Sequence, residues 1–248
     1  MSNPAKPGFV AQHTVPAGAV ATRWWWVRHA PVREDGGCIY GQTDIGCDCS
    51  DRVVFDAVAR ILPRKAAWYA SNLKRTHQTA DAIWAAGFPK PDNMPHEAAF
   101  AEQHLGEWQG LNRAAFFASR PIEVGTYWFA PIDDPAPGGE SFMDLYNRTR
   151  GAVERINSEH AGRDIIAVAH GGTIKAAVGL ALGHQPERGL AFTIDNCSVT
   201  RLDHLFSDGH SGWRIPMVNQ QPWMADAAHN AMHQPVGPEL ASTTSKLA

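Results

Sequence analysis

Short apolar runs alternate with helix-periodic segments along the chain. Residues 24–27 (Trp-Trp-Trp-Val) and 164–169 (Asp-Ile-Ile-Ala-Val-Ala) have the pattern of buried strands. Apolar positions recur at helical spacing over residues 52–62 and 141–158. This alternation predicts an α/β fold: a three-layer αβα sandwich around a mixed, mostly parallel central sheet. The three tryptophans are expected to fill the core on both faces of that sheet.

Shorter elements extend the same plan. Further strands are expected at residues 66–70, 190–194, 198–206 and 213–218. Further helices are expected at residues 74–86, 111–119 and 173–182. Glycines and prolines interrupt residues 31–51 and 120–139, and both segments therefore predict long loops.

The two ends of the chain lack this periodicity. Residues 1–22 are small and polar and predict a flexible leader, and residues 219–248 predict an irregular tail. Residues 23–218 contain no internal repeat and no linker composition. The sequence therefore predicts one domain over residues 23–218.

Composition narrows the class of protein. Hydrophobic residues make up 44% of the 248 residues, which is enough to form a sizeable core, and the net charge of −3 gives no reason to expect nucleic-acid or membrane binding. No run of 18 apolar residues and no signal-peptide pattern is present. Four cysteines are too few for a disulfide scaffold, so a cytoplasmic location is expected. A homo-oligomer is left open.

Candidate chemistry gathers where strands end. Arg28 and His29 follow the first apolar strand, and His170 and Gly171 follow the strand at residues 164–169. Parallel strands end at the same edge of a sheet, so these residues are expected to lie together. Arg75 lies near the start of the helix after a third strand. Arginine forks and helix N-terminal amides both favour a phosphate dianion.

Five blocks in this order resemble the histidine phosphatase superfamily, also called the phosphoglycerate mutase-like family. The matching segments are Arg28-His29-Ala30, residues 71–80 (Ser-Asn-Leu-Lys-Arg-Thr-His-Gln-Thr-Ala), Glu102 with residues 106–110 (Gly-Glu-Trp-Gln-Gly), residues 137–141 (Pro-Gly-Gly-Glu-Ser) and His170-Gly171-Gly172. Together with Asn-x-Ser-Val-Thr at residues 196–200, they cover about residues 23 to 205. Ala30 departs from the family's usual glycine after the nucleophile.

The resemblance implies roles for these residues. His29 would be a nucleophile that forms a phosphohistidine, Glu102 would be the general acid and base, and His170 would help to stabilise the transferred group. Glu107 is the competitor for the acid role. The substrate-binding residues that it implies are Arg28, Arg75, Gly171, Gln42 and Thr43. No cofactor and no metal is implied, and the spacing of Cys47 and Cys49 fits no common zinc site.

The implied function is metal-independent hydrolysis of a small phosphorylated metabolite, a phosphoric monoester. An α-ribazole-phosphate-like compound is one candidate substrate, because an α-ribazole phosphatase-like branch exists in the family. The segment after Asn112 is short compared with phosphoglycerate mutases, which favours a phosphatase. Two alternatives stay open: a cofactor-dependent phosphoglycerate mutase, and a non-catalytic module that binds phosphorylated ligands.

Overall fold

A mixed five-stranded sheet forms the centre of the protein. The computed structural model describes residues 15, 18–120 and 128–225. The strands are β1 (Val20–Arg28), β2 (Ala66–Ala70), β3 (Asp164–Ala169), β4 (Val199–Ser207) and β5 (His210–Gln220), in the spatial order β2-β3-β1-β4-β5. The pairs β2–β3 and β1–β3 are parallel, whereas β4 is antiparallel to both β1 and β5. Within this sheet β4 therefore runs against the other strands, and the predicted mixed, mostly parallel sheet is confirmed.

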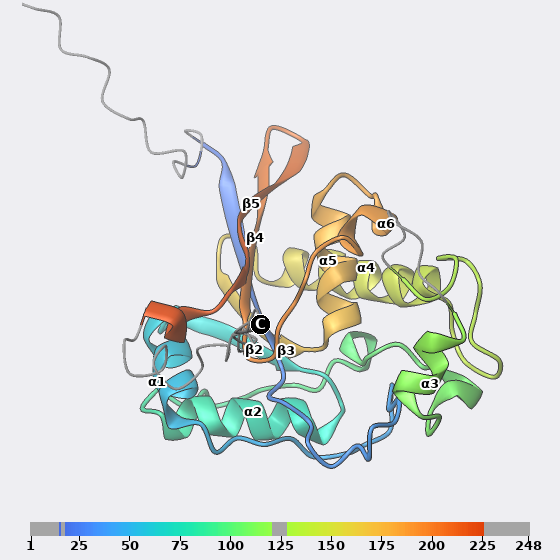
Figure 1. The fold of residues 1–248 in the computed structure, drawn as a ribbon. Coiled ribbons are helices and arrows are strands. Elements are labelled where there is room, and N and C mark those ends of the chain that lie inside the picture. The colour runs from blue at the N-terminus through green and yellow to red at the C-terminus, as the bar shows by residue number, and fades with distance from the viewer. Residues whose placement is uncertain (1–14, 16–17, 121–127, 226–248) are drawn as a thin grey trace, which may run out of the picture.

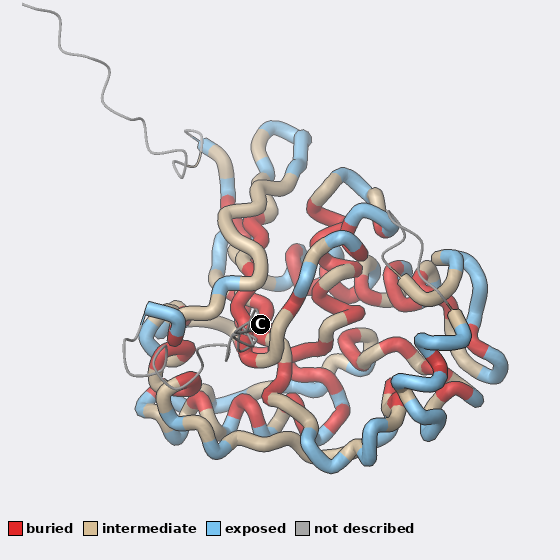
Figure 2. Tube along the Cα trace, viewed as in Figure 1, coloured by how far each residue is buried: buried red, intermediate tan, exposed pale blue. Residues whose placement is uncertain are grey.

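Helices cover both faces of the sheet (Figure 1). The helices are α1 (Arg52–Ile61), α2 (Lys74–Ala85), α3 (Arg113–Ala118), α4 (Phe142–Glu159), α5 (Gly171–Ala181) and α6 (Pro186–Gly189). Apolar residues of α4 and α5 share one buried cluster with one face of the sheet, and those of α1 and α2 share a second cluster with the other face. The three layers follow from this division of the core, which appears as buried central segments in Figure 2.

Local sequence sets the starts of the main helices. The Asp51 side chain accepts a hydrogen bond from the Val54 amide and begins α1. Ser141 and Asp144 form a reciprocal capping box at the start of α4. α5 begins directly at the end of β3, with His170 as its N-cap residue, so the first amides of the helix lie at the strand end.

The tryptophans of β1 pack as predicted on both faces of the sheet. Trp24 and Trp26 are buried in the α4–α5 cluster, and their rings are stacked with centroids 5.1 Å apart. Trp25 packs against the opposite cluster. The Trp24 indole also donates to Asn157 Oδ1 on α4 (2.7 Å), which ties the strand to the helix.

Two parts of the predicted pattern differ from the structure. Residues 190–194 are not a strand: the segment follows the short helix α6, and the Ile194 carbonyl accepts from Arg28 Nη1 instead of from a neighbouring strand. β1 begins at Val20, so the last residues of the predicted leader belong to the sheet. The leader before residue 15, residues 121–127 of the predicted loop and the tail after residue 225 lie outside the described residues.

Part of the predicted tail packs on the domain. Residues Pro222–Ala225 form a short 3-10 helix, and Trp223 is buried in the α1–α2 cluster. Among the described residues, no helix has both the length and the apolar character needed to cross a membrane.

Candidate active site

The parallel pairing of β1 and β3 brings the two predicted histidines together. Arg28 at the end of β1 lies opposite Ala169 at the end of β3, and the His29 amide donates to the Ala169 carbonyl (2.9 Å). The ring centroids of His29 and His170 are 5.1 Å apart, and both side chains are buried. The strand ends thus meet at one edge of the sheet, as the sequence predicts.

A hydrogen bond decides which nitrogen of His29 carries the proton. Nδ1 lies 2.7 Å from the carbonyl oxygen of Ala30. A carbonyl can only accept, so the neutral ring carries its proton on Nδ1 and its lone pair on Nε2. Burial lowers the pKa of His29 well below its usual value, and the charges of Arg28 and Arg75 lower the pKa further. The ring is therefore neutral at pH 7 and carries a nucleophilic lone pair on Nε2.

His170 has the opposite tautomer. Arg75 Nε donates to His170 Nδ1 (3.2 Å), so Nδ1 holds the lone pair and the proton lies on Nε2. Nε2 is 2.7 Å from Ser71 Oγ, which accepts this proton in a hydrogen bond. Burial lowers the pKa of His170 well below its usual value, with the charge of Arg75 as the next cause.

The Arg75 guanidinium is buried and only partly used. Besides its bond to His170, it donates from Nη1 to the Thr43 carbonyl (2.9 Å) and from Nη2 to the Gly41 carbonyl (2.7 Å). A guanidinium has five N–H groups, and the described residues account for three of them. One N–H on each terminal nitrogen is thus left for a ligand oxygen.

Arg28 is a second arginine with an unused donor. Its Nη1 donates to the Ile194 carbonyl, while its buried Nε has no hydrogen-bond partner among the described residues. A Cβ atom on Gly171 would lie 3.5 Å from this Nε, so the guanidinium lies against the start of α5. A buried N–H without a partner is costly, and an anion bound at this point would remove that cost.

The Glu102 carboxylate lies over the N-terminus of α5. The Gly172 amide is 3.2 Å from Oε1 and 3.3 Å from Oε2, and the Gln103 amide donates to Oε1 (2.9 Å). A Cβ atom on Gly172 would overlap Oε1 and would lie 3.1 Å from Leu145 Cδ2. The glycine is therefore required for this close approach.

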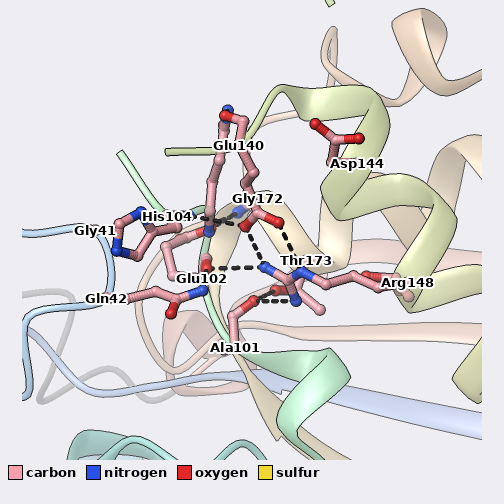
Figure 3. A network of polar contacts seen from close by, with 12 residues as sticks. Gly41, Gln42, Ala101, Glu102, His104, Glu140, Asp144, Arg148, Gly172 and Thr173 are labelled. Atoms are coloured by element: carbon pink, nitrogen blue, oxygen red, sulfur yellow. Dashed lines mark hydrogen bonds and ion pairs between the residues drawn. The ribbon is translucent and has the colours of Figure 1, made fainter. Parts of the chain in front are cut away.

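Arg148 of α4 braces the Glu102 segment, and sequence reasoning did not identify it (Figure 3). It donates to the carbonyls of Ala99, Ala101 and Glu102. It also forms a two-bond ion pair with Glu140, whose carboxylate in turn accepts from the His104 amide. All five N–H groups of Arg148 are used in this way. Glu140 lies in the Pro-Gly-Gly-Glu-Ser block, which was the available sequence signal.

Gln42 and Thr43 belong to the loop that wraps this edge of the sheet. Gln42 Nε2 donates to the Glu102 carbonyl (2.8 Å), and the Thr43 carbonyl accepts from Arg75. Neither residue is among those that line the cleft beside Arg28 and Glu102 that is described below, and Thr43 is exposed. Within the described loop, these two residues therefore contact the Glu102 segment and Arg75.

Asp44 has a clear structural task in the same loop. Its Oδ1 accepts from the Lys74 amide (2.7 Å) at the start of α2. The N-cap residue of this helix, Leu73, has no capping side chain. Asp44 thus satisfies the helix end next to Arg75 from a distant part of the chain.

Two other candidates lie apart from the cluster. Glu107 is exposed and does not line the cleft. The sulfurs of Cys47 and Cys49 are 3.6 Å apart, and the described residues include no group of three or more histidine, cysteine or acidic side chains placed to hold a metal ion. The hydrogen bond from Cys49 lowers the pKa of the Cys47 thiol to about 7.

A cleft of about 410 Å³ opens beside these groups. Arg28, Glu102 and Asn196 line it, together with Pro31 and Val32 from the loop after β1. Its size lies within the range of about 300–1000 Å³ found for small-molecule sites. The cleft therefore has room for more than a phosphate ion.

The fold and this cluster define a histidine phosphatase-like class, and comparison with known proteins agrees. The chain belongs to the histidine phosphatase superfamily (branch 1), whose family model matches residues 24–220.

Similar curated proteins include both mutases and phosphatases. A 2,3-bisphosphoglycerate-dependent phosphoglycerate mutase 2 of Gloeobacter violaceus is 32% identical over 55% of this chain and 63% of its own length. A metal-independent phosphoserine phosphatase of Arabidopsis thaliana is 35% identical over 46% of this chain and 47% of its own length. A glucosyl-3-phosphoglycerate phosphatase of Mycolicibacterium vanbaalenii is 27% identical over 81% of this chain and 95% of its own length. The chain thus spans about half to two thirds of the first two relatives.

Solved structures share the fold. A structure titled mycobacterial hydrolase 2 has a TM-score of 0.68 at 26% identity and covers 82% of this chain and 92% of its own. The native structure of a mycobacterial glucosyl-3-phosphoglycerate phosphatase has a TM-score of 0.64 at 25% identity, and the match covers 80% of this chain and 99% of that one.

Proposed function

We propose that this protein is a metal-independent phosphomonoesterase that transfers the phosphoryl group through His29. The observation that carries the proposal is the hydrogen bond from His29 Nδ1 to the Ala30 carbonyl. It holds the buried, neutral ring with its lone pair on Nε2, beside two arginines with unused donors. The relatives that are phosphatases support the same chemistry.

The reaction has two balanced steps. First, the lone pair on His29 Nε2 forms a bond to phosphorus while the bond from phosphorus to the alcohol oxygen breaks, and Glu102 gives its proton to the departing oxygen. Then a water molecule gives a proton to Glu102, and the oxygen of this water molecule attacks phosphorus. The N–P bond breaks, inorganic phosphate leaves and the lone pair returns to Nε2.

The arginines carry the electrostatic part of this reaction. Arg28 and Arg75 would donate to the oxygens of the transferred phosphoryl group, with His170 and the Gly171 amide beside them. The carboxyl of Glu102 lies by the start of α5, next to Arg28, whereas Glu107 is exposed. This arrangement supports Glu102 as the acid and base. The arginines supply positive charge, so the chemistry requires no metal ion.

A phosphoglycerate mutase is the second candidate, and the similar mutase of Gloeobacter violaceus favours it. A mutase would return the phosphoryl group to its product and would need a bisphosphoglycerate primer. Hydrolysis without primer and isomerisation with primer therefore separate the two functions.

The test is phosphate release from a panel of phosphomonoesters, together with trapping of an acid-labile phosphoprotein. The His29→Ala variant should abolish both turnover and the phosphoprotein. His160→Ala is a matched control, since His160 pairs with Tyr69 away from the cluster, and it should retain both. Unchanged turnover in His29→Ala would refute the mechanism. Primer-dependent isomerisation without phosphate release would identify a mutase.

A further inference from the structure

The cleft beside Arg28 and Glu102 has a wall of aromatic rings. Its lining includes the side chains of Tyr40, Trp108, Phe116, Phe117, Trp128 and Phe129. The rings of Trp108 and Phe116 have centroids 5.3 Å apart, and those of Trp128 and Phe129 are stacked at 4.6 Å. Trp108 also meets Phe129 edge-on at 5.8 Å. The five rings of Trp108, Phe116, Phe117, Trp128 and Phe129 thus form one continuous apolar surface.

The charged groups of the cleft include an ion pair between Asp35 and Arg113. Arg113 donates to both Asp35 and the Cys38 carbonyl, and this hydrogen bond lowers the pKa of Asp35. The pair is therefore ionised on both sides and neutral as a whole. Apart from this pair, Arg28 and Glu102 are the charged residues that line the cleft within the described part of the chain, and the proposed chemistry uses both.

Two further cations, Arg120 and Lys175, lie outside the cleft and contact its aromatic residues. Arg120 lies over the Trp108 and Phe116 rings at 4.5 and 4.6 Å, and Lys175 lies over Trp128 at 5.2 Å. Neither is among the described residues that line the cleft. A carboxylate on the leaving group would therefore lie against aromatic rings and beside Glu102. Of the described cations that line the cleft, Arg28 is used by the phosphoryl group and Arg113 is already paired with Asp35, so the second negative charge is unfavourable.

We propose that the substrate is the phosphomonoester of an uncharged, bulky apolar alcohol, with an aromatic or similarly sized group seated on this wall. The assignment rests on the proposed phosphatase function and specifies its substrate class. The phosphoryl group would bind at the arginines, and the apolar part of the alcohol would replace water against the rings. The wall thereby discriminates against alcohols that carry a carboxylate.

The first test compares alkyl esters whose leaving oxygens are of one kind. We expect kcat/KM for benzyl phosphate to exceed that for 3-phosphoglycerate and O-phosphoserine by at least about tenfold. Equal or better hydrolysis of the carboxylate-bearing esters would overturn the substrate class and leave the phosphatase function intact. Hydrolysis of none of the esters would overturn the phosphatase function itself.

A second test changes the wall. Phe117 is 38% exposed, so Phe117→Arg places a cation in the cleft without emptying the core. The ratio of kcat/KM for benzyl phosphate to that for 3-phosphoglycerate should fall by at least about tenfold. The matched control is Phe206→Arg on β4, at a phenylalanine that is 49% exposed and lies outside the cleft, and it should keep the wild-type ratio. A ratio measured on one preparation does not depend on the folded fraction, and an unchanged ratio in Phe117→Arg would refute the proposal.

Discussion

The position of the Glu102 carboxyl depends on a side chain that Gly172 lacks. Any Cβ atom at Gly172 would lie closer to Glu102 Oε1 than two such atoms can approach. The clash falls on the far end of a flexible side chain, so an added methyl would move Glu102 and leave most of the backbone in place. A substitution at Gly172 can therefore move the acid with little effect on the stability of the fold.

We predict that Glu102→Gln and Gly172→Ala share one leaving-group dependence. Glu102→Gln should slow alkyl esters about 10²–10⁴-fold and aryl phosphates less, because an aryloxide needs less protonation as it leaves. Gly172→Ala should show the same trend with a loss of about 10–100-fold. Rates with benzyl phosphate and phenyl phosphate measure both.

The control for the added methyl is Gly151→Ala on α4. A Cβ atom there meets no atom within 4 Å, so both rates should stay at the wild-type level. Equal slowing of both ester types in Glu102→Gln would place the acid at another residue.

The sequence could predict the position of a site residue where that residue directly follows a regular strand. His29 and His170 follow parallel strands, so periodicity alone predicts that they meet. The approach of Glu102 to Gly172 joins an irregular segment to the start of α5, 70 residues away, and three of the five Arg148 bonds end on carbonyl oxygens. A carbonyl oxygen is the same at every residue, so no sequence pattern marks those three bonds, although the block that contains Glu140 was a signal for the ion pair.

Among the elements, α2 has an unusual beginning. Its start is satisfied by Asp44 from the wrapping loop, which also accepts the Arg75 donors through the carbonyls of Gly41 and Thr43. The loop and the helix thus hold the guanidinium from two sides. This connection couples helix capping to the geometry of the phosphate site.

We predict that Asp44→Ala raises KM and the inhibition constant of inorganic phosphate by about threefold to tenfold. The loss of the cap should also lower the free energy of unfolding by about 1 kcal/mol. Steady-state kinetics with phosphate as a competitive inhibitor, together with urea unfolding, measures both quantities.

The matched control is Asp51→Ala at the N-cap of α1, a helix without any predicted site residue. It should cost a similar free energy of unfolding and leave phosphate binding unchanged. If both variants changed phosphate binding equally, the effect of Asp44 would be one of general stability.

Element boundaries were predicted to within a few residues for the long helices, because helical periodicity and caps act locally. The predicted strand at residues 190–194 was wrong for a non-local reason. Its apolar residues Leu190 and Ile194 are buried, as a strand pattern requires, yet the Ile194 carbonyl accepts from Arg28. A carbonyl that a β-ladder would use is thus bonded to a side chain from the end of β1, a contact that the local apolar pattern does not encode.

For the whole molecule, the two buried histidines make stability depend on pH. The folded protein holds His29 and His170 neutral with lowered pKa values, whereas the unfolded chain binds protons near pH 6.5. Below that pH the unfolded state binds more protons, so stability falls with acidification until the folded pKa values are reached. The slope is up to about 1.4 kcal/mol per pH unit for each histidine.

We predict that the ligand-free protein loses stability between pH of about 7.5 and about 5.5. The double variant His29→Gln, His170→Gln should lose less over the same range. Burial also lowers the pKa values of His160 and His204, so the stability of the double variant should still depend on pH, but less steeply. Urea midpoints at each pH measure the effect, and a wild-type stability that rises on acidification would contradict it.

The stacked tryptophans of β1 give this protein a built-in optical reporter. Trp24 and Trp26 have ring planes within 12° of each other and centroids 5.1 Å apart. Two indoles held this closely couple their electronic transitions, which should produce an exciton couplet in the circular dichroism spectrum. The couplet depends on packing between β1 and α4. During unfolding, its disappearance would therefore report when this packing is lost, independently of the far-ultraviolet signal that reports loss of helix.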